Sequence, residues 1–147
     1  MKLFNVLLVD DAKEDLDLGT EVIQGLSQLT AVHAVNTTDH AIALLDGDWG
    51  SYDPQPLDLV ITDWVMPCGG GERILQHVRS NDELALTPVV VLTAANAQRD
   101  IKNAYRCGAN TVVGKPLDLD GFQTAIQLIL SYWTSLAELP TRTDRPD

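Results

Sequence analysis

The sequence predicts an α/β domain in which a five-stranded parallel sheet is doubly wound, with helices on both of its faces. Apolar runs of strand length alternate with longer segments in which apolar residues recur at every third or fourth position, the period of a helix. Three of the runs are continuously apolar, as parallel strands buried on both faces are. The strict alternation of strand and helix also favours a parallel sheet, because parallel strands need crossover connections.

The predicted elements fill most of the 147 residues, of which 45% are hydrophobic, so we expect one domain with a full core. The strands are predicted at residues 6–9, 31–35, 57–61, 88–93 and 111–113. The helices are predicted at residues 13–29, 38–46, 72–81, 97–107 and 119–137. Residues 48–56 form one long connection that reads as an exposed excursion. We expect residues 1–137 to form the domain and residues 138–147 to form a C-terminal tail, with no output domain.

Composition and charge argue against several classes of protein. The net charge is -11 with only 10 Lys and Arg residues, and nucleic-acid binding rests on cations that neutralise phosphates. The apolar run at residues 3–9 ends at two acids and is too short for a signal peptide or a membrane span. Cys68 and Cys107 lack the spacing of a disulfide framework or a zinc site. We therefore expect a cytoplasmic protein with no membrane or nucleic-acid partner.

Five polar side chains stand at or just after the ends of predicted strands: Asp10, Asp11, Asp63, Thr93 and Lys115. The carboxyl ends of parallel strands meet at one edge of the sheet, where ligands bind near the point at which the strand order reverses. Clustered carboxylates repel one another unless a hard cation neutralises them, which favours Mg²⁺ or Mn²⁺. Helix capping would explain any one of the acids alone. Their joint occurrence at one edge favours a functional site.

Four motifs resemble the receiver domain of bacterial two-component response regulators. They are LLVDD, TDWVMP followed by Gly71, VVLTAA and VVGKP, and the resemblance covers about residues 3–137. The spacings from Asp63 to Thr93 and to Lys115 are those of the chemotaxis response regulator. The resemblance implies a flavodoxin-like fold and a role in phosphorelay signalling. It implies a phosphoacceptor that assists its own phosphorylation and dephosphorylation, rather than an enzyme.

The resemblance also implies a role for each acid. Asp63 resembles the phosphoacceptor, a carboxylate nucleophile that takes a phosphoryl group from a phosphohistidine of a sensor histidine kinase. Asp11 and Asp63, together with the backbone carbonyl of Val65, resemble the ligands of Mg²⁺. Asp10 resembles the acid that holds the metal ion through water.

The remaining motif residues resemble the groups that respond to the phosphoryl group. Thr93 resembles the switch hydroxyl, and Ala94 resembles the residue whose backbone N–H and small side chain adjoin it. The resemblance implies that Lys115 supplies positive charge to the phosphoryl oxygens. The bond from Lys115 to Pro116 resembles a cis peptide of the family, and only X–Pro bonds adopt cis readily.

One position, Val112, departs from the family pattern. Val112 stands where the family often has an aromatic residue that rotates inward, and a β-branched side chain has no comparable pair of rotamers. Tyr105 on the preceding helix is a candidate substitute, although such a residue is more often part of the core. Val65 and Ala95 flank the path of a water that would attack a phosphoryl group in this fold, and neither side chain can hydrogen-bond. A long-lived phosphorylated state is therefore expected.

The last predicted helix carries more apolar residues than one sheet face can cover. The expected core stripe consists of Phe122, Ile126, Ile129, Trp133 and Leu136. Leu128, Tyr132 and Leu139 lie outside it, so they pack under residues 48–56, are exposed singly, or form a dimer face. The insertion at 48–56 and the ending YWTSLAELP resemble stand-alone regulators that pair with phytochrome-type sensor kinases and dimerise through this end.

Two enzyme or cofactor classes share part of this pattern. A haloacid-dehalogenase-like phosphatase also has an Asp nucleophile after a parallel strand, but it needs a second Asp two residues later, where this chain has Val65. A flavodoxin-like flavin binder needs a phosphate loop rich in Ser, Thr and Gly after the first strand, where this chain has Asp10 and Asp11. A receiver that serves only as a phosphate sink stays open as an alternative.

Overall fold

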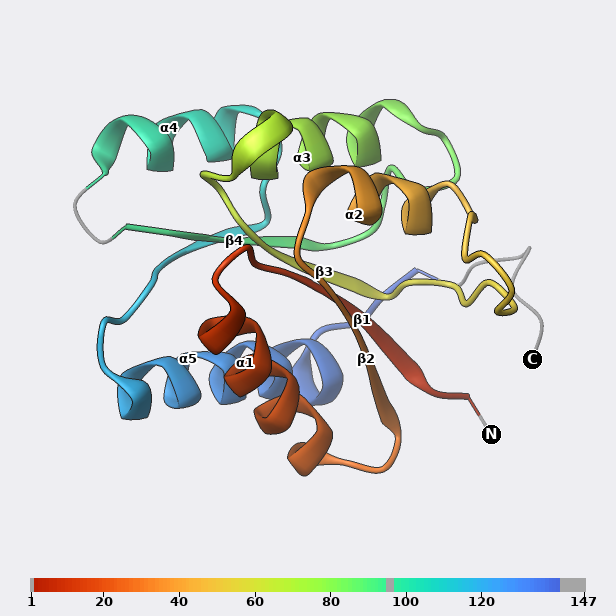
Figure 1. Ribbon diagram of the computed structural model, residues 1–147, viewed down its shortest axis with the longest axis horizontal. Coiled ribbons are helices and arrows are strands. Elements are labelled where there is room, and N and C mark those ends of the chain that lie inside the picture. The colour runs from red at the N-terminus through yellow and green to blue at the C-terminus, as the bar shows by residue number, and fades with distance from the viewer. Residues whose placement is uncertain (1, 95–96, 141–147) are drawn as a thin grey trace.

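The computed structural model describes residues 2–94 and 97–140, and it contains a five-stranded sheet in which all neighbouring strands are parallel (Figure 1). The strand order is β2-β1-β3-β4-β5, so the order reverses between the central strands β1 and β3. The strands are β1 (Phe4–Val9), β2 (Thr30–Val35), β3 (Leu59–Asp63), β4 (Val89–Thr93) and β5 (Thr111–Gly114). The predicted fold class, a doubly wound α/β domain, is confirmed.

Helices cover both faces of the sheet, α2, α3 and α4 on one and α1 and α5 on the other (Figure 1). They are α1 (Lys13–Leu26), α2 (Thr38–Leu45), α3 (Gly70–Ser80), α4 (Gln98–Arg106) and α5 (Leu119–Ser131). Within residues 2–94 and 97–140, no helix is long and apolar enough to cross a membrane.

Two apolar cores lie on opposite faces of the same strands, because successive strand residues point to opposite sides. In β1, Leu7 and Val9 pack in the core under α2 and α3, whereas Val6 and Leu8 pack in the core under α1 and α5. All four side chains are at most 1% exposed. The continuously apolar runs in the sequence are therefore strands with no solvent face, as parallel sheets require.

The third strand begins and ends two residues later than predicted, so Asp63 is its last residue and does not follow it. The reason lies at Asp58, whose side chain accepts a hydrogen bond from the backbone N–H of Asn5 at 2.8 Å. The backbone N–H of Asp58 donates to the carbonyl of Asn5, also at 2.8 Å. A carboxylate thus takes one position in the ladder that a backbone carbonyl would fill, and regular pairing starts after it.

The last helix departs from the predicted span of 119–137 because α5 ends at Ser131 and continues as η2 (Tyr132–Leu136), a wider π-helical turn. The hydroxyl of Thr134 donates to the carbonyl of Leu130 at 2.6 Å, and the backbone N–H of Ala137 reaches back to Tyr132. A wider turn rotates the side chains beyond Ser131 away from their α-helical positions. Leu136 is therefore 72% exposed instead of lying in the core stripe.

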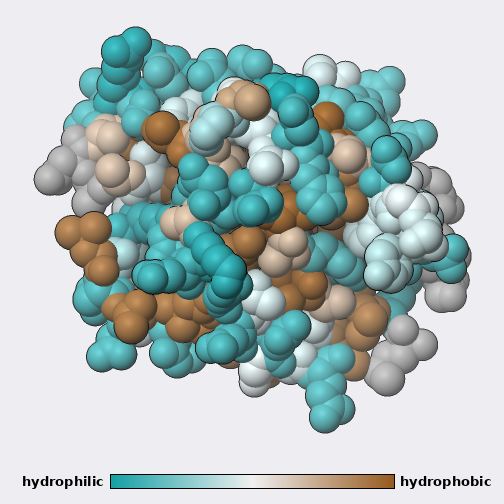
Figure 2. Space-filling view, in the orientation of Figure 1, coloured by the Kyte–Doolittle hydropathy of each residue, from teal (hydrophilic) through white to brown (hydrophobic). Residues whose placement is uncertain are grey.

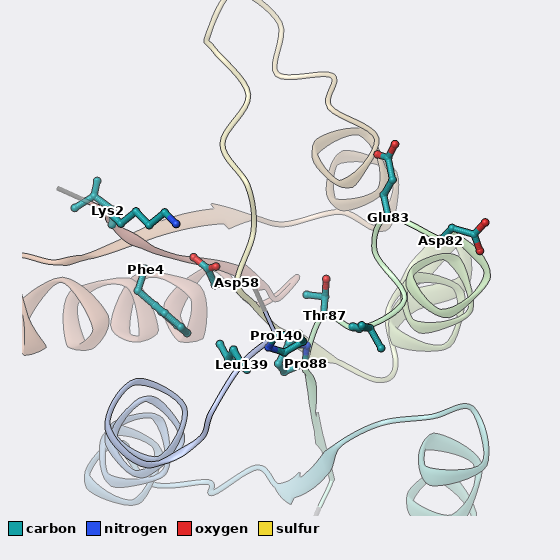
Figure 3. A pocket seen from close by; sticks show the side chains of 11 residues that line it. Lys2, Phe4, Asp58, Asp82, Glu83, Thr87, Pro88, Leu139 and Pro140 are labelled. Carbon is teal, nitrogen blue, oxygen red and sulfur yellow. The ribbon is translucent and has the colours of Figure 1, made fainter. Parts of the chain in front are cut away.

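A groove at the amino ends of the strands receives the chain after η2 (Figure 3). Leu139 and Pro140 line it together with Phe4 and Pro88, in a hollow of about 370 Å³. Leu139 therefore lies in this groove beyond η2, and its place in a dimer face stays a prediction. A residue beyond the helical turns can return to the sheet, which a helical wheel cannot anticipate.

Arg79 at the end of α3 joins three segments through its guanidinium group. Its Nε and Nη2 atoms donate to the carbonyl of Gly108 at 3.0 and 2.9 Å, and Nη2 also reaches the side chain of Asn110 at 2.7 Å. Its Nη1 atom donates to the carbonyls of Ala85 and Thr87. These bonds tie the end of α3 to the connection before β4 and to the turn between α4 and β5.

The excursion at residues 48–56 packs beside the edge strand β2. The indole N–H of Trp49 donates to the carbonyl of Leu44 at 2.9 Å, and its ring meets the ring of His33 edge-on at 4.8 Å. His33 Nε2 lies 3.0 Å from the side-chain oxygen of Asn5. Burial lowers the pKa of His33 from its ordinary value of 6.5, because a charged imidazole is poorly solvated there.

We expect this histidine to make the protein less stable in mild acid. In the unfolded chain His33 binds a proton near pH 6.5, whereas in the folded chain it binds one only at a lower pH. The stability that depends on a neutral His33 is therefore fully present above pH 6.5 and is lost as the pH falls through the folded-state pKa of His33. Urea unfolding at about pH 7.5 and about pH 5.5 should show a smaller loss of stability in His33→Gln than in the wild type. His40→Gln keeps His33 and should keep the full loss. An equal loss in His33→Gln would contradict the assignment.

Candidate functional site

The carboxyl ends of the strands bring the predicted acids together where the strand order reverses. Asp10 follows β1 directly, and Asp63 ends the neighbouring strand β3. One carboxylate oxygen from each of Asp10, Asp11 and Asp63 lies within 4.8 Å of the others. Asp10 is 1% exposed and Asp63 is 9% exposed, whereas Asp11 is open to solvent.

This donor set fits a hard divalent cation. Carboxylate oxygens are the ligands that Mg²⁺ prefers, and Mg²⁺ keeps several waters, which the exposed side at Asp11 can admit. The backbone N–H of Ala12 donates to Oδ1 of Asp10 at 2.9 Å and fixes that carboxylate. Val65, whose carbonyl the family resemblance assigns to the same cation, stands at the rim of the site and is 71% exposed.

Lys115 follows β5 and reaches into the carboxylate cluster. Its Nζ atom lies 2.7 Å from Oδ2 of Asp10 and 3.1 Å from both carboxylate oxygens of Asp63. A third carboxylate, that of Asp15 on α1, lies 2.9 Å from the same Nζ atom. The backbone N–H of Lys115 donates to the carbonyl of Thr93 at 2.7 Å, which fixes the backbone from which the Lys115 side chain extends. Asp15 was not among the predicted site residues, because acids are common in the first turn of any helix.

The electrostatics of the site follow from burial and from the crowding of acids. Burial, followed by the hydrogen bond and the charge of the neighbouring Asp10, raises the pKa of Asp63 to about 7, against the opposing effect of Lys115. For Lys115, burial alone would lower the pKa, but hydrogen bonds to Asp10 and Asp15 and the charges of Asp63 and Asp10 raise it above its ordinary value. The cluster holds more negative charge than one ammonium balances, so it favours a further cation.

A small cavity of about 280 Å³ opens over Asp63. Thr93 lies in its wall and is 5% exposed, and its hydroxyl has no hydrogen-bond partner among residues 2–94 and 97–140. A buried hydroxyl without a partner costs free energy, about 1–3 kcal/mol, and is usually satisfied by a ligand or by water. Ala94, the next residue, is exposed and also lines the cavity. Ala95, named above beside the path of an attacking water, lies outside the described residues.

The chain leaves β3 through a tightly packed turn that fixes the backbone of Asp63. Trp64 is 6% exposed, and its backbone N–H donates to the backbone carbonyl of Leu92 on β4 at 2.9 Å. The N–H of Gly71, at the start of α3, donates to the carbonyl of Trp64 at 2.9 Å. A Cβ atom on Gly71 would lie 2.6 Å from the carbonyl oxygen of Asp63. Glycine is therefore required at position 71 by this close approach of two backbones.

Two expectations concern residues at or next to β5: the peptide bond before Pro116 and the role of Tyr105. The bond between Lys115 and Pro116 is trans, so the expected cis peptide is wrong. The ammonium of Lys115 reaches Asp10 and Asp63 with the trans bond in place. The hydroxyl of Tyr105 on α4 accepts a hydrogen bond from the backbone N–H of Val112 at 3.2 Å. Tyr105 is 50% exposed, so it lies over the outer side of the edge strand and outside the core.

Comparison with known proteins identifies the family. The model of the response regulator receiver domain matches residues 6–127, so the chain belongs to the response regulator receiver domain family. Receiver domains are signalling proteins and not classical enzymes. Response regulator Rcp1 from Synechocystis sp. is 29% identical over 145 residues, which are 92% of this chain and 92% of Rcp1. A probable chemotaxis protein CheY from Rhizobium etli is 30% identical over 128 residues, 84% of this chain and 90% of that protein.

Solved structures agree with this assignment. The phosphorylated cyanobacterial phytochrome response regulator RcpA has a TM-score of 0.87 and 28% identity, covering 95% of this chain and 99% of RcpA. The Mn²⁺-bound form of Rcp1 has a TM-score of 0.83 and 28% identity, covering 94% of this chain and 99% of Rcp1.

We expect Gly71→Ala to destabilise the protein, because the added Cβ atom would meet the backbone of Asp63 and Trp64. Overpacking of this kind costs about 1–3 kcal/mol, less the gain that alanine gives to a helix. Gly25→Ala on α1 is the matched control, since a Cβ atom there meets nothing within 4 Å. It should stabilise the protein by about 0.5–1 kcal/mol. Urea unfolding measures both, and equal effects of the two substitutions would contradict the close approach at Gly71.

Proposed function

We propose that this protein is a response regulator whose receiver unit, residues 1–137, accepts a phosphoryl group on Asp63 from a sensor histidine kinase. The observation that carries the proposal is the position of Lys115, whose ammonium contacts both carboxylate oxygens of Asp63 at 3.1 Å inside an acidic cluster. We assign Mg²⁺ to Asp10, Asp11, Asp63 and the carbonyl of Val65. Bound there, the metal ion would supply positive charge to the phosphoryl oxygens.

The residues of the site suit a phosphoryl transfer that needs positioning and charge neutralisation more than covalent help. A carboxylate oxygen of Asp63 attacks phosphorus, and the phosphorus–nitrogen bond of the phosphohistidine breaks as the new oxygen–phosphorus bond forms. Lys115 neutralises the phosphoryl oxygens as they enter the cavity over Asp63. The hydroxyl of Thr93, which has no partner among the described residues, is available to donate to a phosphoryl oxygen.

A phytochrome-type kinase is the partner that we propose. Support comes from the names of the relatives, because RcpA is described as a cyanobacterial phytochrome response regulator and matches 95% of this chain. The exposed apolar side chains of Val65 and Leu117 line the cavity over Asp63. They offer apolar surface on which a kinase can pack around the phosphohistidine. This partner would place the protein in the cytoplasm.

We expect Asp63 to be the one site of phosphorylation and to require Mg²⁺. A small-molecule phosphodonor should add one phosphoryl group by mass spectrometry, and neither Asp63→Asn nor the wild type with EDTA should take it up. Asp53→Asn, at an exposed acid in the excursion, is the control and should be labelled like the wild type. Undiminished labelling of Asp63→Asn would refute the assignment.

We also propose that the protein signals as a dimer through α5 and η2. Leu128 is 66% exposed, Tyr132 is 50% exposed and Leu136 is 72% exposed, so the end of the last helix presents apolar surface. Residues 48–56 pack at the edge of β2 instead and do not cover these side chains. Figure 2 shows apolar surface gathered over the layer of α1 and α5, while the layer of α2, α3 and α4 is mostly hydrophilic.

The dimer is tested by placing charges on this surface. Leu128→Glu combined with Tyr132→Glu should give a folded monomer by light scattering and circular dichroism, because a two-fold contact presents each charge twice. Tyr52→Glu is the matched control, since Tyr52 is also a large hydrophobic side chain and is 79% exposed, but it belongs to the excursion at residues 48–56 beside β2. It should leave the dimer intact. A wild-type protein that is monomeric with and without phosphodonor would rule out the dimer.

A further inference from the structure

Asp15 contacts Lys115 without belonging to the carboxylate cluster. Its Oδ2 atom lies 2.9 Å from Nζ of Lys115, about as close as the oxygen of Asp10 at 2.7 Å. The three oxygens that group within 4.8 Å come from Asp10, Asp11 and Asp63, and Asp15 is not among them. The side chain of Asp15 is 35% exposed, against 2% for Asp10 and 12% for Asp63. Lys115 is thus shared between two inner carboxylates and one at the mouth of the site.

An ammonium and a divalent cation compete for the same oxygens here. Nζ of Lys115 bonds Asp10 and both carboxylate oxygens of Asp63, the acids that are assigned to the metal ion. Two cations in contact with one carboxylate pair repel each other strongly in a partly buried site. Either the ammonium moves outward as the metal ion enters, or it weakens the binding of the metal ion. An ammonium has three donors, and its contact with Asp15 is with a carboxylate outside the group of Asp10, Asp11 and Asp63.

We propose that Asp15 is a positioning residue that holds the ammonium of Lys115 at the mouth of the site when a divalent cation occupies the inner carboxylates. The inference rests on the metal binding in the proposed function and adds a residue to it. Asp15 lies in the first turn of α1, which begins right after Asp11 and Ala12, so its place relative to the cluster is fixed by a short rigid connection. The flexible stem of Lys115 allows its head to move between these carboxylates.

The surroundings of Lys115 support this role for Asp15. The other group that faces the ammonium is the ring of Phe122 on α5, whose centroid lies 5.9 Å from Nζ, near the limit of a useful cation–π contact. Among the described residues, Asp10, Asp15 and Asp63 are the acids within 4 Å of Nζ, so an ammonium displaced from Asp10 and Asp63 keeps Asp15 as its charged partner. By remaining near the cavity over Asp63, the ammonium stays close to an incoming phosphoryl group.

The experiment measures Mg²⁺ affinity by isothermal titration calorimetry at fixed ionic strength. Asp15→Asn should weaken Mg²⁺ binding about five-fold or more beyond the effect of Asp17→Asn, as expected for a coupled charge contact. Asp17 is the matched control, because it is an acid on the same helix that pairs with Lys13 at 3.4 Å and is 64% exposed. Asp15→Glu keeps a carboxylate beside Lys115 and should recover most of the affinity.

The Lys115→Met background separates positioning from direct attraction. If Asp15 acts through Lys115, adding Asp15→Asn to Lys115→Met should change the affinity no more than adding Asp17→Asn does. A full Asp15→Asn effect without Lys115 would mean that Asp15 acts on the metal ion itself, and the inference would fall. Equal effects of Asp15→Asn and Asp17→Asn in the wild-type background would also overturn it. A wild-type protein that shows no saturable Mg²⁺ binding would overturn the proposed function along with it.

Discussion

The repulsion among buried carboxylates at the centre of the sheet is the constraint that organises this molecule. Asp10 follows β1, Asp63 ends the neighbouring strand β3, and both are almost fully buried, so water solvates their charges poorly. Lys115, which follows the edge strand β5, contacts both carboxylates. Fixing these groups within hydrogen-bonding distance requires strands that cannot slide, because a small shift in register would leave a charge buried and unpaired.

The two apolar cores supply the rigidity that this arrangement needs. Each central strand is held by close packing on both faces, where a side chain of the size of Leu7 or Ile61 contributes roughly 1.5–3 kcal/mol when it is fully buried. The turn after β3 extends this rigidity to the site, since Trp64 is buried in one core and Gly71 packs directly on its backbone. Packing stabilises the strands, and the strands keep the acids in place.

The sequence was sufficient for the sheet and for the inner site because both follow from where apolar runs end. Strand ends coincide in a parallel sheet, so Asp10, Asp63 and Lys115 could be placed together without coordinates. Asp15 could not be found in this way, since an acid in the first turn of a helix looks the same whether it faces solvent or a lysine. The exposure of Leu136 depended on a single widened turn, which no repeating pattern encodes.

The guanidinium of Arg79 holds the C-terminal end of α4 in place. Its bonds to Gly108 and Asn110 anchor the chain just beyond the C-terminal end of that helix. The opposite end starts a few residues after Thr93, and Ala97 is hydrogen-bonded to the carbonyl of Ala94 at 3.2 Å. A displacement that begins at Thr93 would swing the near end of α4 and leave the far end still. The amplitude of such a motion is therefore greatest beside the site and decays along the helix toward its anchor.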